Sequence, residues 1–111
     1  MPHTWDGDMV FVLKAPNGQV LNLDYYLSAT GGAGVTTGFV NTTVSSAGTA
    51  ALSSGTNPYT GTFRADARTV AQAPFGAPGP TAFLPTTASW TSLYSVPNGT
   101  YTLAMYDGGP A

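Results

Sequence analysis

The stretch that decides the fold runs from His3 to Gln19 and reads HTWDGDMVFVLKAPNGQ. After an Asp-Gly-Asp corner, the side chains fall into two alternating sets, which are Met9, Phe11 and Leu13 on one parity and Val10, Val12 and Lys14 on the other. A period of two residues is typical of a β-strand, because successive side chains of a strand point to opposite faces of the sheet. The pattern therefore predicts a strand with one face in a hydrophobic core.

The segment after this strand predicts a chain reversal. It reads Ala15-Pro16-Asn17-Gly18, in which proline presets the backbone before the bend and Asn-Gly tolerates the positive φ that a tight turn needs. Gln19 to Leu23 then resumes a strand-like pattern. The two runs are expected to form a β-hairpin.

Further short strands are predicted along the rest of the chain, at Gly38 to Val44, Tyr59 to Arg64 and Tyr101 to Tyr106. Ala88 to Tyr94 fits either a helical turn or a strand. Arg68 to Thr87 contains four prolines and is expected to be a long loop. Several short strands without an amphipathic helix predict an all-β sandwich, and residues 1–111 are expected to be a single domain.

Composition excludes several kinds of chemistry. Charged residues make up 7% of the chain and its net charge is −2, so no basic patch is available for nucleic acid. The chain has no cysteine and one histidine, which excludes disulfides and a structural zinc site. No apolar stretch approaches the length that spans a membrane, and we expect neither nucleic acid nor membrane as a partner. A lysine-poor, cysteine-free β sequence is typical of secreted and cell-surface bacterial proteins.

Three short motifs occur in order along the chain. The first comprises His3, Thr4, Gly7, Asp8, the strand Met9 to Leu13, Pro16 and Gly18; the second is Tyr59-Thr60-Gly61-Thr62-Phe63-Arg64; the third is Pro97-Asn98-Gly99-Thr100-Tyr101-Thr102-Leu103, followed by Asp107. Together they resemble motifs of the P domain, the β-sandwich that follows the subtilisin-like catalytic domain of furin- and kexin-type proprotein convertases. P domains also occur as appended modules of secreted bacterial proteins.

This resemblance implies an antiparallel, jelly-roll-like β-sandwich with a non-catalytic accessory role. Such a module stabilises or docks a neighbouring domain of its parent chain, here a subtilisin-like serine protease domain, outside the cell. P domains have one or two strands before the His-Thr motif and a further strand after the aspartate-rich turn. The chain is therefore expected to be a sandwich that lacks one or more terminal strands and is excised from a longer exported protein.

The acidic residues offer a candidate calcium site. Asp6 and Asp8 flank Gly7 at a loop corner, and Asp107 is a remote partner that could complete a set of oxygen ligands. The alternative is ordinary turn chemistry, because aspartate accepts backbone N–H bonds and favours bends. Calcium is accordingly the one cofactor that we consider from the sequence.

The remaining candidate residues have structural alternatives as well. His3 and Thr4 are expected to pin the turn before the first strand, as the matching pair does in the family, with Asp8 as a structural acceptor. Asn98 and Gly99 are expected to form the turn before the last strand. No serine lies in a G-x-S-x-G context, and we expect no enzymatic activity.

Two further interpretations concern binding. Trp5 and Trp90 could stack on sugars in a carbohydrate-binding or adhesive module, although core packing is the alternative reading of both rings. If strands are missing, the unpaired edges of the first and last strands would recruit a neighbour by strand addition or swapping. The second interpretation predicts a homo-oligomer or another strand-completed assembly.

Overall fold

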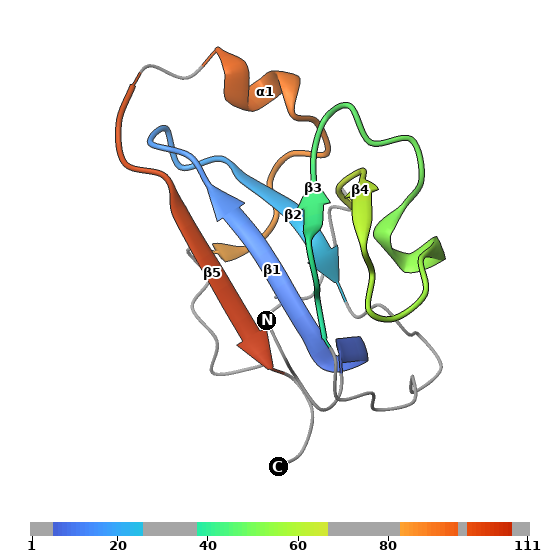
Figure 1. The fold of residues 1–111 in the computed structure, drawn as a ribbon. Helices are drawn as coiled ribbons and strands as arrows, with labels where there is room; N and C mark the ends of the chain where they lie inside the picture. Colours follow the sequence, from blue (N-terminus) through green and yellow to red (C-terminus); the bar gives the residue numbers. More distant parts are fainter. Residues whose placement is uncertain (1–5, 26–37, 67–82, 96–97, 108–111) are drawn as a thin grey trace.

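The computed structural model describes residues 6–25, 38–66, 83–95 and 98–107. Within these ranges the elements, in chain order, are η1 (Asp6–Asp8), β1 (Met9–Lys14), β2 (Val20–Tyr25), β3 (Thr42–Val44), η2 (Leu52–Ser54), β4 (Gly61–Phe63), α1 (Thr91–Tyr94) and β5 (Thr102–Asp107). The strands form a three-stranded sheet in the order β2-β1-β5 and a two-stranded sheet of β3 and β4 (Figure 1). The described chain is thus mostly strand with one short helix, which is compatible with the predicted all-β class.

The predicted hairpin is confirmed. β1 and β2 pair antiparallel on either side of the turn, with Leu13 opposite Leu21 and Lys14 opposite Val20. The turn closes through bonds from the Gly18 N–H to the Ala15 carbonyl (2.9 Å) and from the Ala15 N–H to the Gln19 carbonyl (2.8 Å). Gly18 has φ +86°, the left-handed conformation that glycine adopts without steric cost. This is a tight turn followed by a one-residue bulge.

β1 is the central strand, and both of its faces are covered rather than the single face that the sequence predicted. On one face Val10 and Val12 are 0% exposed and cluster with Val20 beneath Phe83. On the other face Phe11 and Leu13 are half-buried. Phe11 contacts Phe39, and Leu13 packs against the cluster that contains Leu21 and Leu93. Lys14 belongs to the Val10 parity, and its Nζ lies 5.4 Å from the centre of the Phe83 ring, a cation–π contact.

The smaller sheet differs from the expected antiparallel pattern. β3 and β4 pair parallel, with Thr42 opposite Gly61 and Val44 opposite Phe63. A parallel pair needs a long crossover connection, and residues 45–60 supply one through η2. Leu52 of η2 and Phe63 of β4 form the buried centre of this part, with Phe39, Val44 and Tyr59 packed around them.

The crossover runs close to the end of β4. The Ser45 N–H donates to the Phe63 carbonyl (2.8 Å), and a Cβ built on Gly48 would lie 2.1 Å from the backbone carbon of Phe63. Only a residue without a side chain fits at this position. Gly48 therefore allows the close passage of the crossover over β4.

The two edges of the three-stranded sheet differ. At the β2 edge, the N–H groups of Thr86 and Thr87 donate to the Val20 carbonyl at 2.9 and 3.1 Å, and the Asp66 N–H donates to the Leu23 carbonyl at 3.0 Å. The Thr86 hydroxyl in turn accepts from the Val20 N–H at 2.9 Å. The β2 edge is thus occupied by other segments, and β5 forms the opposite edge (Figure 1).

The structure also shows which secondary structure forms in Ala88 to Tyr94, where the sequence fitted either a helical turn or a strand. Residues 91–94 form α1, with Leu93 buried, so Ala88 to Tyr94 contains a helical turn and not a strand. The last strand is Thr102–Asp107, one residue later than predicted. Most of the predicted proline-rich loop, residues 68–82, lies outside the described residues.

We expect Gly48→Ala to lower the free energy of unfolding by roughly 1–3 kcal/mol, because the new methyl group would force the crossover away from β4. Urea denaturation followed by circular dichroism measures this loss. The matched control is Thr49→Ala at the exposed neighbouring residue, which should change stability by less than about 0.5 kcal/mol. Equal stability of the two variants would contradict the close approach.

Asn22 generates a second stability prediction. Its side chain is 0% exposed on β2, opposite Val12, and neither its Nδ2 nor its Oδ1 has a hydrogen-bond partner within the described part of the chain. A buried amide without a partner costs free energy that an apolar group of the same shape does not. We expect Asn22→Leu to leave the melting temperature unchanged or raise it, and Asn22→Ala, which leaves a cavity, to lower it. A clear loss of stability in Asn22→Leu would mean that the amide is satisfied by a buried water.

Candidate functional site

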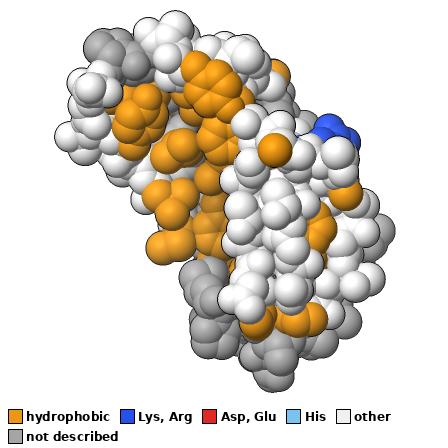
Figure 2. Space-filling model, turned by 45° about the horizontal axis from the view of Figure 1, so that its top comes forward, with side chains coloured by type: hydrophobic (Ala, Val, Ile, Leu, Met, Phe, Trp, Pro, Cys, Tyr) orange, Lys and Arg blue, Asp and Glu red, His pale blue; other side chains and the backbone are white. Residues whose placement is uncertain are grey.

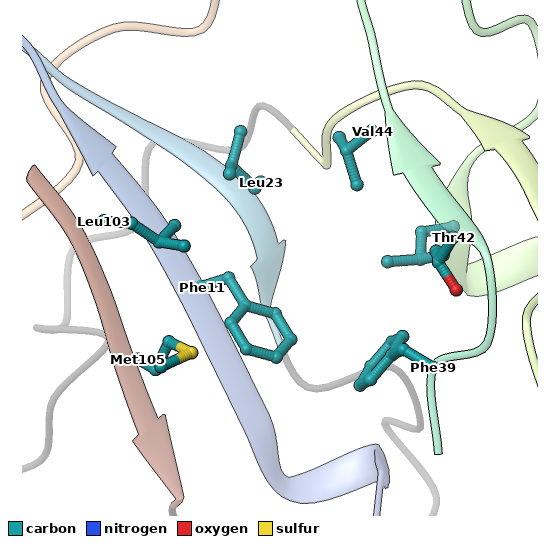
Figure 3. Close-up of a pocket in the computed structure, with 8 residues that line it drawn as sticks. Phe11, Leu23, Phe39, Thr42, Val44, Leu103 and Met105 are labelled. Atoms are coloured by element: carbon teal, nitrogen blue, oxygen red, sulfur yellow. The ribbon is translucent and has the colours of Figure 1, made fainter. Parts of the chain in front are cut away.

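A groove, which we call the intersheet groove, lies between the two sheets. It has a volume of about 200 Å³ and is lined by Phe11, Leu23, Phe39, Thr42, Val44, Leu52, Leu103 and Met105. In Figure 3 the side chains from β1, β2 and β5 lie on one side of the gap. Those from residues 39–44, which we call the β3 segment, lie on the other side, and the two sets point toward one another. The lining is almost entirely apolar.

The register between β1 and β5 determines which side chains form one wall of the groove. β1 and β5 pair antiparallel without a bulge, with Phe11 opposite Met105 and Leu13 opposite Leu103. Directly opposite residues of an antiparallel pair point to the same face of the sheet. The alternation of each strand therefore brings Phe11, Leu103 and Met105 to the face that looks toward β3.

Aromatic contacts join the two walls. The rings of Phe11 and Phe39 meet edge to face with their centroids 5.3 Å apart, and Phe39 stacks on Tyr59 at 5.6 Å. Pairs in these geometries contribute beyond the apolar area they bury. The aromatic row holds the β3 segment against β1 at one part of the groove and leaves the side toward β5 open.

The open side exposes two large apolar side chains. Leu103 is 54% exposed and Met105 is 56% exposed, although both line the groove. Figure 2 shows hydrophobic side chains gathered in a band on one face of the molecule, with the visible basic side chain away from this band. A contiguous apolar surface of this kind is the usual mark of an interaction site.

On the side away from β1, no strand of the described part of the chain pairs with β5 at these two residues. The Ala15 N–H bonds to Gln19, so alternation along β1 directs the N–H and C=O groups of Lys14, Val12 and Val10 toward β5. Their partners Thr102, Ala104 and Tyr106 thus bond inward to β1, and the backbone groups of Leu103 and Met105 point away from it. No other backbone group of the described residues bonds to Leu103 or Met105 on that side. We call this row of groups the β5 edge.

The side chains that line the groove suit it to bind apolar groups. Its single polar side chain, Thr42, donates its hydroxyl to the Tyr59 carbonyl at 2.6 Å. None of the lining residues can hold or move a proton, or ligate a metal through a charged group. The volume is below the usual range for small-molecule sites and suits a few apolar side chains.

The residues of the predicted calcium site are brought close in part. Asp6 and Asp8 form η1 at the start of β1, and Asp107 pairs with Met9, the residue next to Asp8. Among the described residues, no group of three or more acidic or histidine side chains is arranged to hold a metal ion. Calcium binding by Asp6, Asp8 and Asp107 stays a prediction.

The other sequence candidates lie away from the groove. Asn98 and Gly99 are exposed in the bend before β5. Trp90 is half-buried against the cluster of Leu21 and Leu93, with its Nε1 buried and without a partner in the described part of the chain. His3, Thr4 and Trp5 lie outside the described residues.

The sequence reasoning did not identify the groove residues Phe39, Leu103 and Met105 as a site. A signal was present in β5, where Leu103 and Met105 alternate with Thr102 and Ala104 and no charge occurs before Asp107. An edge strand with apolar residues on one parity and no charged residue in its middle is a strand that lacks the usual protection against pairing. This signal identifies the strand but not the opposite wall of the groove.

A comparison of the chain with family models, curated proteins and solved structures finds no match in any of the three. Within the described residues, no helix is long and apolar enough to cross a membrane.

Proposed function

We propose that this chain is a non-catalytic β-sandwich module that binds another polypeptide at the intersheet groove and the β5 edge. The observation that carries the proposal is the coincidence at Leu103 and Met105. Their side chains are more than half exposed beside an apolar groove, and their backbone groups point outward from the same edge. An extended polypeptide satisfies both features at once, because it supplies backbone partners and alternate apolar side chains.

The sandwich architecture is part of this proposal. Its support is the contact of Phe11 with Phe39, which brings the β3 segment onto one face of the three-stranded sheet. A strand added beside β5 would extend the larger sheet along the open side of the groove. Apolar side chains of the added strand would then fill the space between Met105 and the β3 segment, as in the core of a two-layer sandwich.

The resemblance to P domains supplies the biological setting that we propose. The module belongs to an exported bacterial protein and acts outside the cell as an accessory to another domain. A neighbouring subtilisin-like protease domain is one polypeptide that fits this role. Two of the three motifs that carry the resemblance, at residues 9–13 and 97–103, cover most of β1 and lead into β5, which are strands that form one wall of the groove.

The groove favours a polypeptide over a carbohydrate. Sugar sites combine exposed aromatic rings with free hydrogen-bond groups, but the hydroxyl of Thr42 is already bonded and the other lining groups are apolar. Trp90, the described member of the predicted sugar contacts, is half-buried with its indole nitrogen enclosed. We therefore propose a polypeptide, and not a carbohydrate, as the ligand of the groove.

The test is titration of the full chain with a synthetic peptide of alternating valine and threonine, followed by amide NMR. We expect shifts confined to β5 and the groove, and Leu103→Lys or Met105→Lys should weaken binding about tenfold by placing a charge on the apolar wall. Thr43→Lys is the matched control, since it adds the same charge to β3 at an exposed residue that alternates with the groove residues Thr42 and Val44. A peptide N-methylated at alternate amides should bind weakly, because it cannot complete the ladder.

Two results would contradict the proposal. One is no binding of the peptide at millimolar concentration. The other is binding that Thr43→Lys weakens as much as Leu103→Lys does, which would place the peptide elsewhere.

A further inference from the structure

We infer that the polypeptide at the β5 edge is the β5 strand of a second copy of this chain, paired antiparallel about a two-fold axis that passes through Ala104. This inference rests on the proposed function and names the partner of the same site. Three features of β5 support this pairing, which are the register of its backbone groups, the side chains on each of its faces and the placement of charge along it.

The backbone groups are self-complementary about Ala104. Leu103 and Met105 carry the outward N–H and C=O groups, and they stand one residue on either side of Ala104. A two-fold axis at Ala104 sets Leu103 of each copy opposite Met105 of the other. Each such pair exchanges two N–H···O bonds, as hydrogen-bonded pairs of an antiparallel sheet do.

The side chains are compatible with this register on both faces. On the groove face, Leu103 of each copy lies beside Met105 of the other, so that the four exposed apolar side chains cover one another. On the opposite face the axis falls on Ala104, whose small side chain leaves room for its own symmetry mate. Thr102 of one copy then faces Tyr106 of the other.

Charge also favours pairing between copies. Residues 101–106 contain no charged side chain, and Asp107 would lie opposite Tyr101 of the second copy. No like charges are therefore placed directly opposite each other across the axis. A shift by two residues would instead set Asp107 against the apolar Leu103, at a cost in desolvation.

The two edges of the sheet show why β5 is the pairing edge. β5 has no lysine, proline or bulge, the devices that keep edge strands from pairing. The β2 edge accepts bonds from Thr86, Thr87 and Asp66. Pairing through β5 is a closed, symmetric contact in which the same surface of each copy is used.

The experiment measures the solution mass of the full chain by sedimentation over a range of concentrations, together with site-specific crosslinking. We expect a dimer of twice 11.3 kDa that dissociates on dilution. Met105→Pro removes an outward N–H and keeps the bonds between β1 and β5, so it should weaken the dimer at least about tenfold. Circular dichroism checks that this variant remains folded.

Crosslinking tests the register directly, because the chain has no cysteine of its own. Residue 104 would face its symmetry mate in a non-hydrogen-bonded pair with Cα atoms about 4.5 Å apart, which is within the range for a disulfide. Ala104→Cys should therefore form a covalent dimer on mild oxidation, whereas Thr102→Cys and Met105→Cys should stay near background.

A monomer at millimolar concentration that still binds the valine–threonine peptide would overturn the second copy as partner and leave the proposed function standing. A dimer that crosslinks through residue 102 or 105 better than through residue 104 would overturn the register. Absence of both dimer and peptide binding would overturn the inference and the proposed function together.

Discussion

The structure depends on β1 having a partner strand on each side and an apolar cluster on each face. Val10 and Val12 are fully buried beneath Phe83, while on the other face Phe11 lines the intersheet groove and Leu13 packs against the cluster that contains Leu21 and Leu93. A slip of one residue in β1 would exchange these two sets and place Lys14 on the groove face, among apolar side chains that offer its charge no partner. The register of β1 consequently fixes the positions of β2 and β5, and through Phe11 it fixes the position of the β3 segment.

The intersheet groove follows from this arrangement because its walls differ in length. β5 is a six-residue strand, whereas β3 is a three-residue strand, so the smaller sheet cannot cover the whole face of the larger one. Phe39 contacts Phe11 and closes one part of the space, and Leu103 and Met105 remain uncovered beyond it. The groove is thus a product of incomplete coverage of one sheet by another, and its apolar character is that of an interior.

The local features of the fold could be predicted from the sequence. The hairpin at Ala15–Gly18 and the last strand carry their own signals, which are turn residues and alternation, and both were located within one residue. The parallel pairing of β3 with β4, the close approach at Gly48 and the coverage of β1 on both faces depend on contacts between distant segments, which a local pattern does not encode. The same limit applies to the site, since Phe39 and Met105 are far apart in the chain and meet only through β1. Proximity of Asp107 to Asp8 follows from the β1–β5 register, a pairing that sequence spacing alone does not specify.

The contrast between the two edges of the larger sheet bears on how far assembly can proceed. A sheet with two open edges can add strands at both ends and grow into a fibre, as cross-β aggregates do. Here Val20 and Leu23 of β2 already accept bonds from other segments of the same chain. If β5 pairs as proposed, growth would therefore end after one addition, and the bonds that Thr86, Thr87 and Asp66 make to β2 would act as a stop against polymerisation. A threonine pair on a coil segment would in this way protect a β-rich, weakly charged protein from forming amyloid.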